Sequence, residues 1–579
     1  MTNPQSRLLQ DLASFVRDEQ RAVSDQLLAV WNRPLEQKLR TGWSQRLTWI
    51  ERTDEPGLLR AHLDGGHSRF REGDMLMLHT AHPIDDMLAR QLMLETEDDD
   101  GWLLRGKDVD AAVRAFGGRV CYADPDAIDL TAWFEQVLEE IAKAPIGQQA
   151  VLPLLTGESD ITFRDADVIA GERAALVRGF NAAQARAVGL AFGAEQLACI
   201  QGPPGTGKTA VLALAVRLMV ERGERVLVTS HTHMAINNAL NKVAAEGVSV
   251  VKIGRAPQRK GLDAGVPCHD DFAQWQRRPA DGGWAIGATP FATMTQRLEG
   301  CEFDTIVFDE ASQITVPLAL MAMRKGRRFV FVGDHQQLPP VMLSRSVLDA
   351  GTMSAFAALT SRHADHSVML DETYRMNRWL AAWPSRTHYG GKLRAAGANR
   401  ERRLALREVP AAFSAVLDGQ APGVFVPTLD RAARGVNLRD AELAAQLCAA
   451  AVAGGLTPGE IGIVTPYRAQ GRALRNALRV ALGAAAAREV VADTVERMQG
   501  QERELVIVSL ASSDAVFLAA VAGFLFQPQR LNVAITRARV QLIVIGPEPE
   551  SLTAHEHPEV ASWIEQYADF ARQMKRVAL

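Results

Sequence analysis

The chain has 579 residues with a formal net charge of −4, and its 47% hydrophobic and 23% charged residues are ordinary globular values. At roughly 150 residues per domain, this length predicts several compact units, each large enough to bury a core. No apolar run approaches the 18 or more residues of a membrane span, and the polar N-terminus lacks a secretory signal, so we expect a cytoplasmic protein without a membrane partner.

The first third, residues 1–175, is expected to form a helical stalk with a small β-barrel accessory domain. Apolar residues recur with a helical period from residue 1 to about 48 and again over 130–143, which predicts two long amphipathic helices. Short strand-like pieces separated by Gly and Asp lie between them, at 58–63, 75–78, 91–94, 102–104 and 120–122. The pattern suggests a barrel and leaves its closure open.

From about residue 176, short apolar strands alternate with helical stretches. They lie at 197–200, 225–229, 305–308 and 328–332, and a second set follows at 461–464, 505–509 and 541–546. This alternation is typical of α/β units with parallel sheets. We therefore expect two such units in tandem, over residues 176–366 and 367–579. The Ala-rich segment 480–490 fits either a helix or a loop.

The cysteine pattern gives no sign of a covalent or metal framework. The five cysteines lie far apart and include no C-x-x-C pair. This spacing favours buried free thiols over disulfides, a zinc site or an iron–sulfur site. Because the net charge of the whole chain is negative, any affinity for a polyanion must come from a local groove.

A phosphate-binding loop follows the first strand of the α/β region. It reads Gly202-Pro203-Pro204-Gly205-Thr206-Gly207-Lys208-Thr209, matches G-x-x-x-x-G-K-[ST], and lies between a strand and a helical pattern, as that motif requires. Glycines let backbone N–H groups turn around a phosphate, and the following helix adds the positive end of its dipole. We expect Lys208 to reach the β- and γ-phosphates of ATP and Thr209 to bind Mg²⁺.

A carboxylate pair, Asp309-Glu310, follows the strand at 305–308. At a strand end that faces the phosphate loop, Asp309 can hold Mg²⁺ and Glu310 can act as the general base for the attacking water. A solvated pair at a strand end is the common alternative. The phosphate loop favours the catalytic interpretation.

The strand at 328–332 runs into GDHQQLPP at 333–340. Together with VFDEASQ and the phosphate loop, this segment resembles the motif set of superfamily-1 helicases, in particular the UPF-like 5′-to-3′ branch, superfamily 1B. The resemblance covers about residues 176–546 and implies two RecA-like P-loop domains with ATP in the cleft between them. The motif wording is most similar to the helicase half of the helicase-nucleases that process Okazaki flaps, although their iron–sulfur cysteine spacing and room for a nuclease domain are missing.

The resemblance assigns nucleotide contacts outside the phosphate loop. Gln184 resembles the glutamine that reads adenine, and Tyr374 the tyrosine that stacks on it. Gln337 resembles the γ-phosphate sensor, and Glu502 the carboxylate that binds the ribose hydroxyl. The sequence departs from the family at Gln501, where arginine is usual, and this puts one phosphate or inter-motif contact in doubt.

Two arginines resemble those that reach ATP from the second domain, Arg375 and Arg537. An arginine from an opposing domain stabilises the charge on a transferring phosphoryl group, an effect of about 10³- to 10⁵-fold in rate. It also makes hydrolysis depend on domain closure. A surface salt bridge is the usual alternative for an arginine.

Five residues resemble the lining of the family's single-strand track: Thr232, His233, Thr289, Thr465 and Thr494. Hydroxyl and imidazole groups suit phosphate contacts that do not discriminate between bases. Histidines at a strand end are also often structural, so the role of His233 stays open.

These features predict an ATP-dependent translocase and helicase on single-stranded nucleic acid, 5′-to-3′, with DNA favoured over RNA and with hydrolysis coupled to closure of two domains. One alternative is a helicase that remodels RNA or ribonucleoprotein. Another is an ATP-switched nucleic-acid clamp with little unwinding. A small-molecule P-loop kinase is disfavoured because it would not need the motifs of the second domain.

Overall fold

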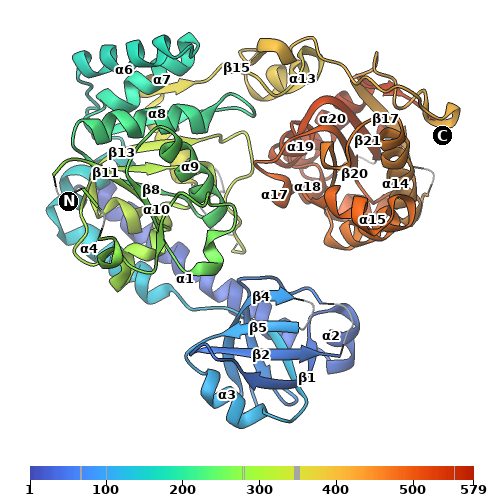
Figure 1. Cartoon of the computed structure of the whole chain (residues 1–579), viewed down its shortest axis with the longest axis horizontal. Coiled ribbons are helices and arrows are strands. Elements are labelled where there is room, and N and C mark those ends of the chain that lie inside the picture. The colour runs from blue at the N-terminus through green and yellow to red at the C-terminus, as the bar shows by residue number, and fades with distance from the viewer. Residues whose placement is uncertain are drawn as a thin grey trace.

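A computed structural model describes the chain apart from residues 65–67, 99–100, 277, 280, 345–352, 429 and 553–554. Figure 1 shows a small barrel beneath two larger α/β units. The chain passes from a helical stalk into the barrel, returns along the stalk to the first α/β unit, and continues into the second.

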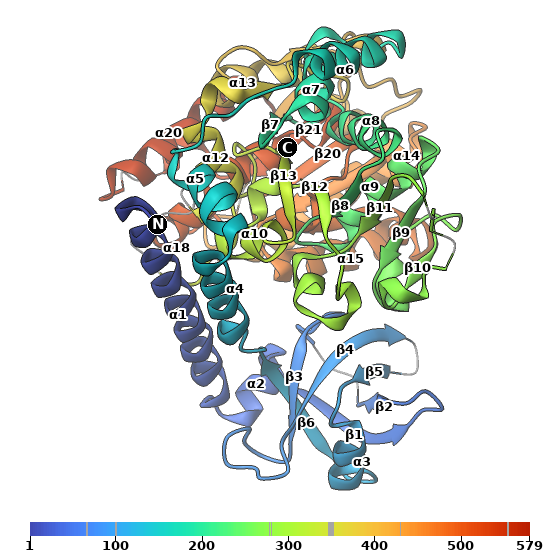
Figure 2. The ribbon, with the colours of Figure 1, turned by 90° about the vertical axis from the view of Figure 1, so that its left-hand side faces the viewer.

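The stalk consists of two helices that pack side by side, α1 (Asn3–Trp31) and α4 (Thr131–Lys143) (Figure 2). The expectation of one helix up to about residue 48 is wrong. Helix α1 ends before Pro34, whose ring fixes φ and removes an amide donor, and a separate short helix, α2 (Leu35–Thr41), follows. The next residues already belong to the barrel, because β1 begins at Gln45.

The barrel predicted from the strand-like pieces is present, and it is closed, with the antiparallel strand order β1-β2-β5-β4-β3-β6. Alternate side chains of its strands, such as Leu76 and Leu78, are completely buried inside it. Helix α3 (Val109–Phe116) lies outside, with Phe116 turned into the core. The strands are β1 (Gln45–Arg52), β2 (Leu58–Leu63), β3 (Met75–His79), β4 (Arg90–Asp98), β5 (Gly101–Arg105) and β6 (Cys121–Asp126).

The first α/β unit contains an eight-stranded parallel sheet in the order β10-β9-β11-β8-β12-β13-β7-β14. Phe329 and Phe331 of β13 pack into the core on one face, and Val330 and Val332 into the core on the other. Burial on both faces explains the continuous apolar runs in these strands. The strands are β7 (Leu197–Gln201), β8 (Arg225–Thr229), β9 (Val250–Ile253), β10 (Cys268–His269), β11 (Trp284–Gly287), β12 (Phe303–Phe308), β13 (Gly326–Gly333) and β14 (Ser367–Met369).

Helices cover both faces of this sheet (Figure 2). They are α5 (Leu152–Thr156), α6 (Asp165–Val177), α7 (Ala182–Gly193), α8 (Lys208–Glu221), α9 (His233–Ala245), α10 (Val316–Met323) and α12 (Ala355–Arg362). Because β14 pairs with β7, the sheet extends to Met369, past the boundary we placed at residue 366.

The second α/β unit contains a parallel sheet in the order β19-β18-β20-β21-β17-β22. Its strands are β17 (Gly423–Pro427), β18 (Ile461–Thr465), β19 (Val491–Thr494), β20 (Arg503–Ser509), β21 (Ala538–Gly546) and β22 (Lys575–Arg576). Its helices are α14 (Leu438–Ala453), α15 (Arg468–Leu482), α16 (Ala484–Glu489), α17 (Val495–Met498), α18 (Ala515–Leu525), α19 (Pro528–Ile535) and α20 (Pro558–Arg572). The Ala-rich segment is helical on both sides of Gly483, whose φ of 79° separates α15 from α16.

The two α/β units are connected through helix α13 (Arg378–His388) and the small parallel pair β15 (Glu372–Thr373) and β16 (Arg394–Ala395), which lie between them at the top of Figure 1. The expected α/β class is thus confirmed, with two tandem parallel sheets, a helical stalk and a barrel. Of the described helices, none combines the length and the apolar character that crossing a bilayer requires.

Candidate nucleotide site and nucleic-acid track

The phosphate loop connects the end of β7 to the start of α8. Gly205 and Gly207 have φ values of 74° and 83°, in the left-handed region where a side chain is strained. The Lys208 side chain folds back over the loop, and its Nζ donates to the Gly202 carbonyl at 2.7 Å. A Cβ at Gly202 would lie 1.9 Å from Lys208 Cγ, so only a glycine at this position leaves space for the lysine side chain. The spacing of the motif is therefore a direct requirement of the local geometry.

The connection to the second unit touches this loop. Thr373 Oγ1 donates to the Pro204 carbonyl at 2.8 Å, and the Tyr374 backbone N–H donates to the Gly205 carbonyl at 2.8 Å. Within the loop, Thr206 Oγ1 donates to the Pro203 carbonyl at 2.8 Å. The loop is consequently held from both sides, by its own hydroxyl and by β15.

Gln184 and Tyr374, the two residues expected at adenine, are joined through Asn181. The Gln184 side chain accepts from the Asn181 backbone N–H at 3.1 Å and donates to the Thr206 carbonyl at 3.0 Å. Asn181 Nδ2 donates to the Tyr374 hydroxyl at 3.0 Å. Tyr374 is 40% exposed. Its ring therefore keeps a face for stacking beside the phosphate loop.

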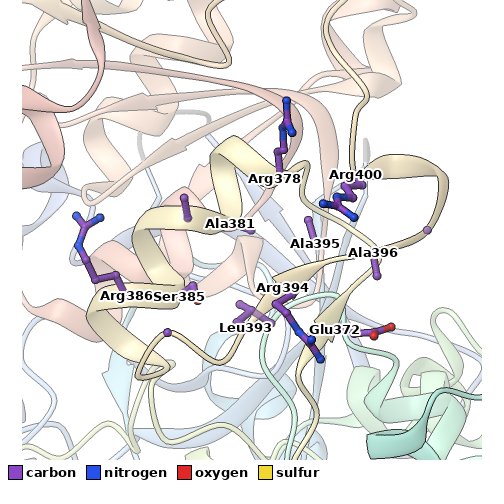
Figure 3. A pocket seen from close by; sticks show the side chains of 13 residues that line it. Glu372, Arg378, Ala381, Ser385, Arg386, Leu393, Arg394, Ala395, Ala396 and Arg400 are labelled. Atoms are coloured by element: carbon purple, nitrogen blue, oxygen red, sulfur yellow. The ribbon is translucent and has the colours of Figure 1, made fainter.

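A pocket of about 760 Å³ adjoins Tyr374 on the side of α13 and β16 (Figure 3). A Cβ at Gly397, one of its lining residues, would lie 3.1 Å from Tyr374 Cδ1. Each arginine around this pocket has a carboxylate within 4 Å: Arg378 and Arg400 share Glu401, Arg386 pairs with Asp569, and Arg394 pairs with Asp371.

The carboxylate pair follows β12 as expected. Asp309 is 5% exposed, and burial, followed by the negative charge of Glu310, raises the pKa of its carboxyl, whereas Lys208 acts in the opposite direction. A divalent cation would reverse this balance and hold the carboxylate ionised. Thr209, in the first turn of α8, supplies a neutral oxygen, so the donor set suits a Mg²⁺ that arrives with phosphates. In the described part of the chain, no group of three His, Cys, Asp or Glu side chains forms a metal cage.

Glu310 is held by the second unit. Its φ of 49° is unusual for a residue with a side chain and turns it away from the strand direction. Gln499 Nε2, from the loop after α17, donates to Glu310 Oε2 at 3.2 Å. The general base proposed from the sequence thus meets an amide of the other sheet, which the sequence analysis did not select.

A buried network at the end of β13 also links the two units. Gln337 Nε2 donates to Asp334 Oδ2 at 2.8 Å, and the Tyr389 hydroxyl donates to the same oxygen at 2.8 Å. Asn532 Nδ2, from α19, donates to the Tyr389 hydroxyl at 2.9 Å and to the Gln336 carbonyl at 2.8 Å. Burial, and then the charge of Asp334, raises the pKa of Tyr389, so its hydroxyl stays a donor.

Gln337 was selected from the sequence, but its network partners Asp334, Tyr389 and Asn532 were not. Asp334 lies inside the recognised segment GDHQQLPP, and Asn532 lies five residues before Arg537, but no local signal pairs them. Tyr389 lies at the end of α13, outside every motif that was used. Only the fold brings the three together.

The two expected arginines lie next to each other. Arg375 is 9% exposed, and its Nε donates to Glu502 Oε2 at 2.5 Å while its Nη1 donates to the Thr536 carbonyl at 3.1 Å. Arg537 is 1% exposed, with its Nε donating to the Val533 carbonyl at 2.8 Å. Burial, and then the charge of Arg375, lowers the pKa of Arg537 to about 9. The site is therefore short of negative charge in this conformation.

Two of the assigned positions have other contacts here. The Glu502 carboxylate, expected at a ribose, pairs with Arg375. Gln501, at the position where arginine is usual, accepts from Arg503 Nη2 at 3.0 Å and donates to the Arg497 carbonyl at 2.9 Å. Gln501 therefore stabilises its own loop.

The expected track residues follow the carboxyl ends of strands in both sheets. Thr465 and Thr494 are register partners on β18 and β19, and both are buried. Thr232 caps α9 by accepting from the Ala235 N–H at 3.2 Å, and burial lowers the pKa of the adjacent His233 to about 4, so this imidazole is neutral at pH 7. Thr289 is half-buried in the turn after β11. The structure brings Thr232 and His233 together, and separately Thr465 and Thr494.

Two models of the AAA domain match the chain, one over residues 179–404 and the other over 352–549. The DNA replication ATP-dependent helicase/nuclease DNA2 of Mus musculus is 30% identical over 411 residues, which cover 64% of this chain and 37% of that protein. The Homo sapiens protein of the same name is 30% identical over 413 residues, covering 65% and 38%. The chain is thus similar to AAA-domain models over residues 179–549 and to helicase/nucleases of DNA replication over about two thirds of its length.

The two AAA-domain matches together include every nucleotide-site residue discussed above, since these residues all lie between 179 and 549. The protein of the same name in Saccharomyces cerevisiae is 27% identical over 470 residues, covering 76% of this chain and 30% of its own length. The chain thus spans between 30% and 38% of the length of these three curated relatives. Among solved structures, the Arterivirus nonstructural protein 10 helicase is 14% identical with a TM-score of 0.38, covering 92% of this chain and 82% of that one.

Proposed function

We propose that this chain is an ATP-dependent translocase and helicase on single-stranded nucleic acid, which moves 5′-to-3′ and favours DNA over RNA. The main support for the proposal is that residues of both α/β units together form the nucleotide site. Arg375 lies against the phosphate loop, because a Cβ added at Gly205 would lie only 2.3 Å from the Cβ of Arg375. On the other side of the site, Gln499 of the second unit contacts Glu310 of the first. Hydrolysis at such a site depends on how the two units are placed.

At the phosphate loop, Lys208 leaves the Gly202 carbonyl to bind the β- and γ-phosphates of ATP, and Thr209 and Asp309 hold Mg²⁺. The metal ion, when bound, offsets the negative charge of the phosphates. Glu310 orients and deprotonates the attacking water. Gln499 must then give up its hydrogen bond to Glu310, or turn with it toward the water.

At the opposite side of the cleft, Arg375 and Arg537 stabilise the charge that spreads over the transferring phosphoryl group. Burial, and then their mutual repulsion, lowers the pKa of Arg537, and the incoming phosphates relieve that repulsion. Gln337 senses the γ-phosphate, and its partner Asp334 passes that contact to Tyr389 and Asn532 of the second unit. Closure is thereby coupled to the state of the nucleotide.

Adenine is expected between Gln184 and the exposed ring of Tyr374, and Glu502 becomes free for the ribose when Arg375 turns to the phosphates. On the nucleic-acid side, Thr232, His233, Thr289, Thr465 and Thr494 remain the proposed track. His231, one residue before Thr232, lies within electrostatic reach of Glu310. This proximity supports a path from the track to the general base.

The preference for DNA is supported by the relatives, whose names describe helicase/nucleases of DNA replication. Remodelling of RNA or ribonucleoprotein, and an ATP-switched clamp, are the competing functions. We also propose the cytoplasm as the location, supported by five cysteines that are all free, as expected in a reducing compartment. The proposed domain division is 1–175, 176–366 and 367–579, with β14 added to the middle unit.

The test measures ATP hydrolysis with matched single-stranded DNA and RNA, followed by unwinding of duplexes with a 5′ or a 3′ overhang. We expect stimulation by DNA above RNA, and unwinding from the 5′ overhang alone. Lys208→Ala should abolish hydrolysis, and Glu310→Gln should hydrolyse far more slowly while still binding ATP. Hydrolysis that ignores every single strand would refute the motor, equal unwinding from both overhangs would refute the polarity, and stimulation without unwinding would favour the clamp.

A further inference from the structure

Asn181, the residue before helix α7, uses the two halves of its side-chain amide for different contacts. Its Oδ1 accepts from the Gln184 backbone N–H at 2.8 Å, and Gln184 Oε1 accepts in return from the Asn181 N–H at 3.1 Å. This reciprocal pair caps the start of the helix, where amide groups would otherwise lack partners. A cap needs only an acceptor, so serine or aspartate would serve it equally well. The cap therefore leaves the Nδ2 group of Asn181 unexplained.

The Nδ2 group reaches the connection between the two units. It donates to the Tyr374 hydroxyl at 3.0 Å and to Glu372 Oε2 at 3.1 Å. The Tyr374 hydroxyl donates to the same Glu372 oxygen at 3.1 Å. Because each of these three groups is bonded to the other two, the end of the Tyr374 side chain is fixed relative to α7.

Two carboxylates act on the Tyr374 hydroxyl, Glu372 and Asp371. Asp371 is itself paired with Arg394 at 2.6 Å. Burial raises the pKa of Tyr374, and both carboxylates act in the same direction, whereas the hydrogen bond from Asn181 acts in the opposite one. The hydroxyl therefore remains protonated at neutral pH, and it donates to Glu372 while it accepts from Asn181.

The ring of Tyr374 is also held along one edge, by Gly397. The φ of Gly397 is 66°, and a Cβ added there would lie 3.1 Å from Tyr374 Cδ1 and 3.6 Å from Tyr374 Cε1. The backbone after β16 thus lies against this edge, while Tyr374 as a whole keeps 40% of its surface exposed. A ring that is held at its hydroxyl and along one edge has little freedom left to change rotamer.

Asn181 also connects this arrangement to the phosphate loop. Gln184 Nε2 donates to the Thr206 carbonyl at 3.0 Å, and a Cβ at Gly207 would lie 2.7 Å from the same nitrogen. Through Asn181, the amide of Gln184 and the ring of Tyr374 are held in one arrangement beside the loop. These are the two side chains to which the proposed function assigns the adenine base.

We propose that Asn181 is a positioning residue for the adenine base, because its Nδ2 group holds the Tyr374 ring in the orientation that stacks on the base before a nucleotide arrives. The inference rests on the proposed function and deepens it, since Asn181 then sets how much of the affinity for ATP comes from the base rather than from the triphosphate. The apparent affinity of a site rises with the fraction of molecules already in the binding arrangement. The contacts of the phosphate loop with the triphosphate do not depend on this fraction.

The test compares the parent and Asn181→Ser in their affinities for ATP and for inorganic tripolyphosphate, which lacks the base and the ribose, by displacement of a fluorescent nucleotide. Serine keeps the cap but loses the donor. Because two hydrogen bonds are lost, one of them to a carboxylate, ATP should bind about tenfold more weakly. Tripolyphosphate should bind within about twofold of the parent, which also verifies that the variant folds. The KM for ATP should rise while kcat changes little.

Tyr374→Phe tests the same link from the other end. Phenylalanine keeps the ring for stacking but lacks the hydroxyl, so the affinity for ATP should fall as it does in Asn181→Ser. Residues that act through one contact are not additive, so Asn181→Ser/Tyr374→Phe should be little weaker than either single variant. Fully additive losses would contradict the link between Asn181 and the ring.

The matched control is Asn437→Ser. Asn437 caps α14 by accepting from the Asp440 N–H at 3.0 Å, and its Nδ2 donates to Thr428 Oγ1 at 3.0 Å, so the same donor is lost at another helix. This variant should bind both ligands as the parent does. If Asn181→Ser keeps its affinity for ATP, or loses affinity for both ligands equally, Asn181 does not position the base, although the motor can still stand. If the parent itself binds ATP no more tightly than tripolyphosphate, the base site assigned in the proposed function fails as well.

Discussion

The hydroxyl of Tyr389 is the single atom whose removal should separate nucleotide sensing from closure. Tyr389 is 3% exposed and lies between the two units. Its hydroxyl donates to Asp334 Oδ2 and accepts from Asn532 Nδ2. Tyr389→Phe removes this atom and keeps the ring. Gln337 retains its bond to Asp334, so the sensor itself stays in place.

The size of the effect follows from the two bonds that are lost. A hydrogen bond to a charged carboxylate contributes about 1.5 to 3 kcal/mol, and the neutral bond from Asn532 about 1 kcal/mol. Together they amount to about 2 to 4 kcal/mol, which corresponds to about 30- to 1,000-fold in the equilibrium between closed and open units. Because part of this loss falls on folding stability rather than on closure, we expect kcat/KM for ATP to fall by at least about tenfold at saturating single strand.

The control for this variant is Tyr567→Phe. Tyr567 is 1% exposed in the second unit, and its hydroxyl donates to the Pro547 carbonyl at 2.9 Å, with no bond to the first unit. Its loss should cost about 1 kcal/mol of stability and leave kcat/KM within about twofold. The assay is steady-state hydrolysis with thermal unfolding of each variant alongside. Equal kcat/KM for the two variants would refute the role of Tyr389 in closure.

Three further changes test separate features. Arg537→Lys keeps the charge but loses the planar fork, so single-turnover hydrolysis should slow by about 10³-fold while binding of a fluorescent nucleotide changes little; parity in rate would exclude a role in phosphoryl transfer. Lys38→Met removes one of the two buried basic partners of Asp124 in the barrel and leaves only His79, 3.3 Å away; it should cost up to about 3 to 5 kcal/mol in urea unfolding, whereas an unchanged midpoint would show that the Lys38–Asp124 pair is dispensable. Burial lowers the pKa of His388 to about 4, below its ordinary 6.5, so the unfolded chain takes up the proton first and stability falls as pH drops from about 6.5 toward 4, by up to about 1.4 kcal/mol per unit. Unfolding midpoints at several pH values should be less pH-dependent in His388→Gln, and an identical dependence would contradict this assignment.

The sequence alone determined those parts of the protein whose physics is local. The phosphate loop needs left-handed residues at Gly205 and Gly207 and a helix that starts at Lys208, and these requirements are written in consecutive residues. The inner strands β7, β8, β12 and β13 of the first sheet and β18, β20 and β21 of the second could be located because burial on two faces leaves continuous apolar runs, whereas the other strands were not found. The first helix was overextended since apolar periodicity continued past Pro34, where the backbone cannot follow it.

Only the tertiary structure decided how the units meet. The barrel closes through pairing of β1 with β6, and Gln499 of the second unit donates a hydrogen bond to Glu310 of the first. Each of these contacts joins residues far apart in the chain, so none leaves a period or a spacing that could be recognised. Hydrogen bonds and charges act over a few ångströms of space, and which residues share that space is fixed by the packing of the apolar cores beneath them.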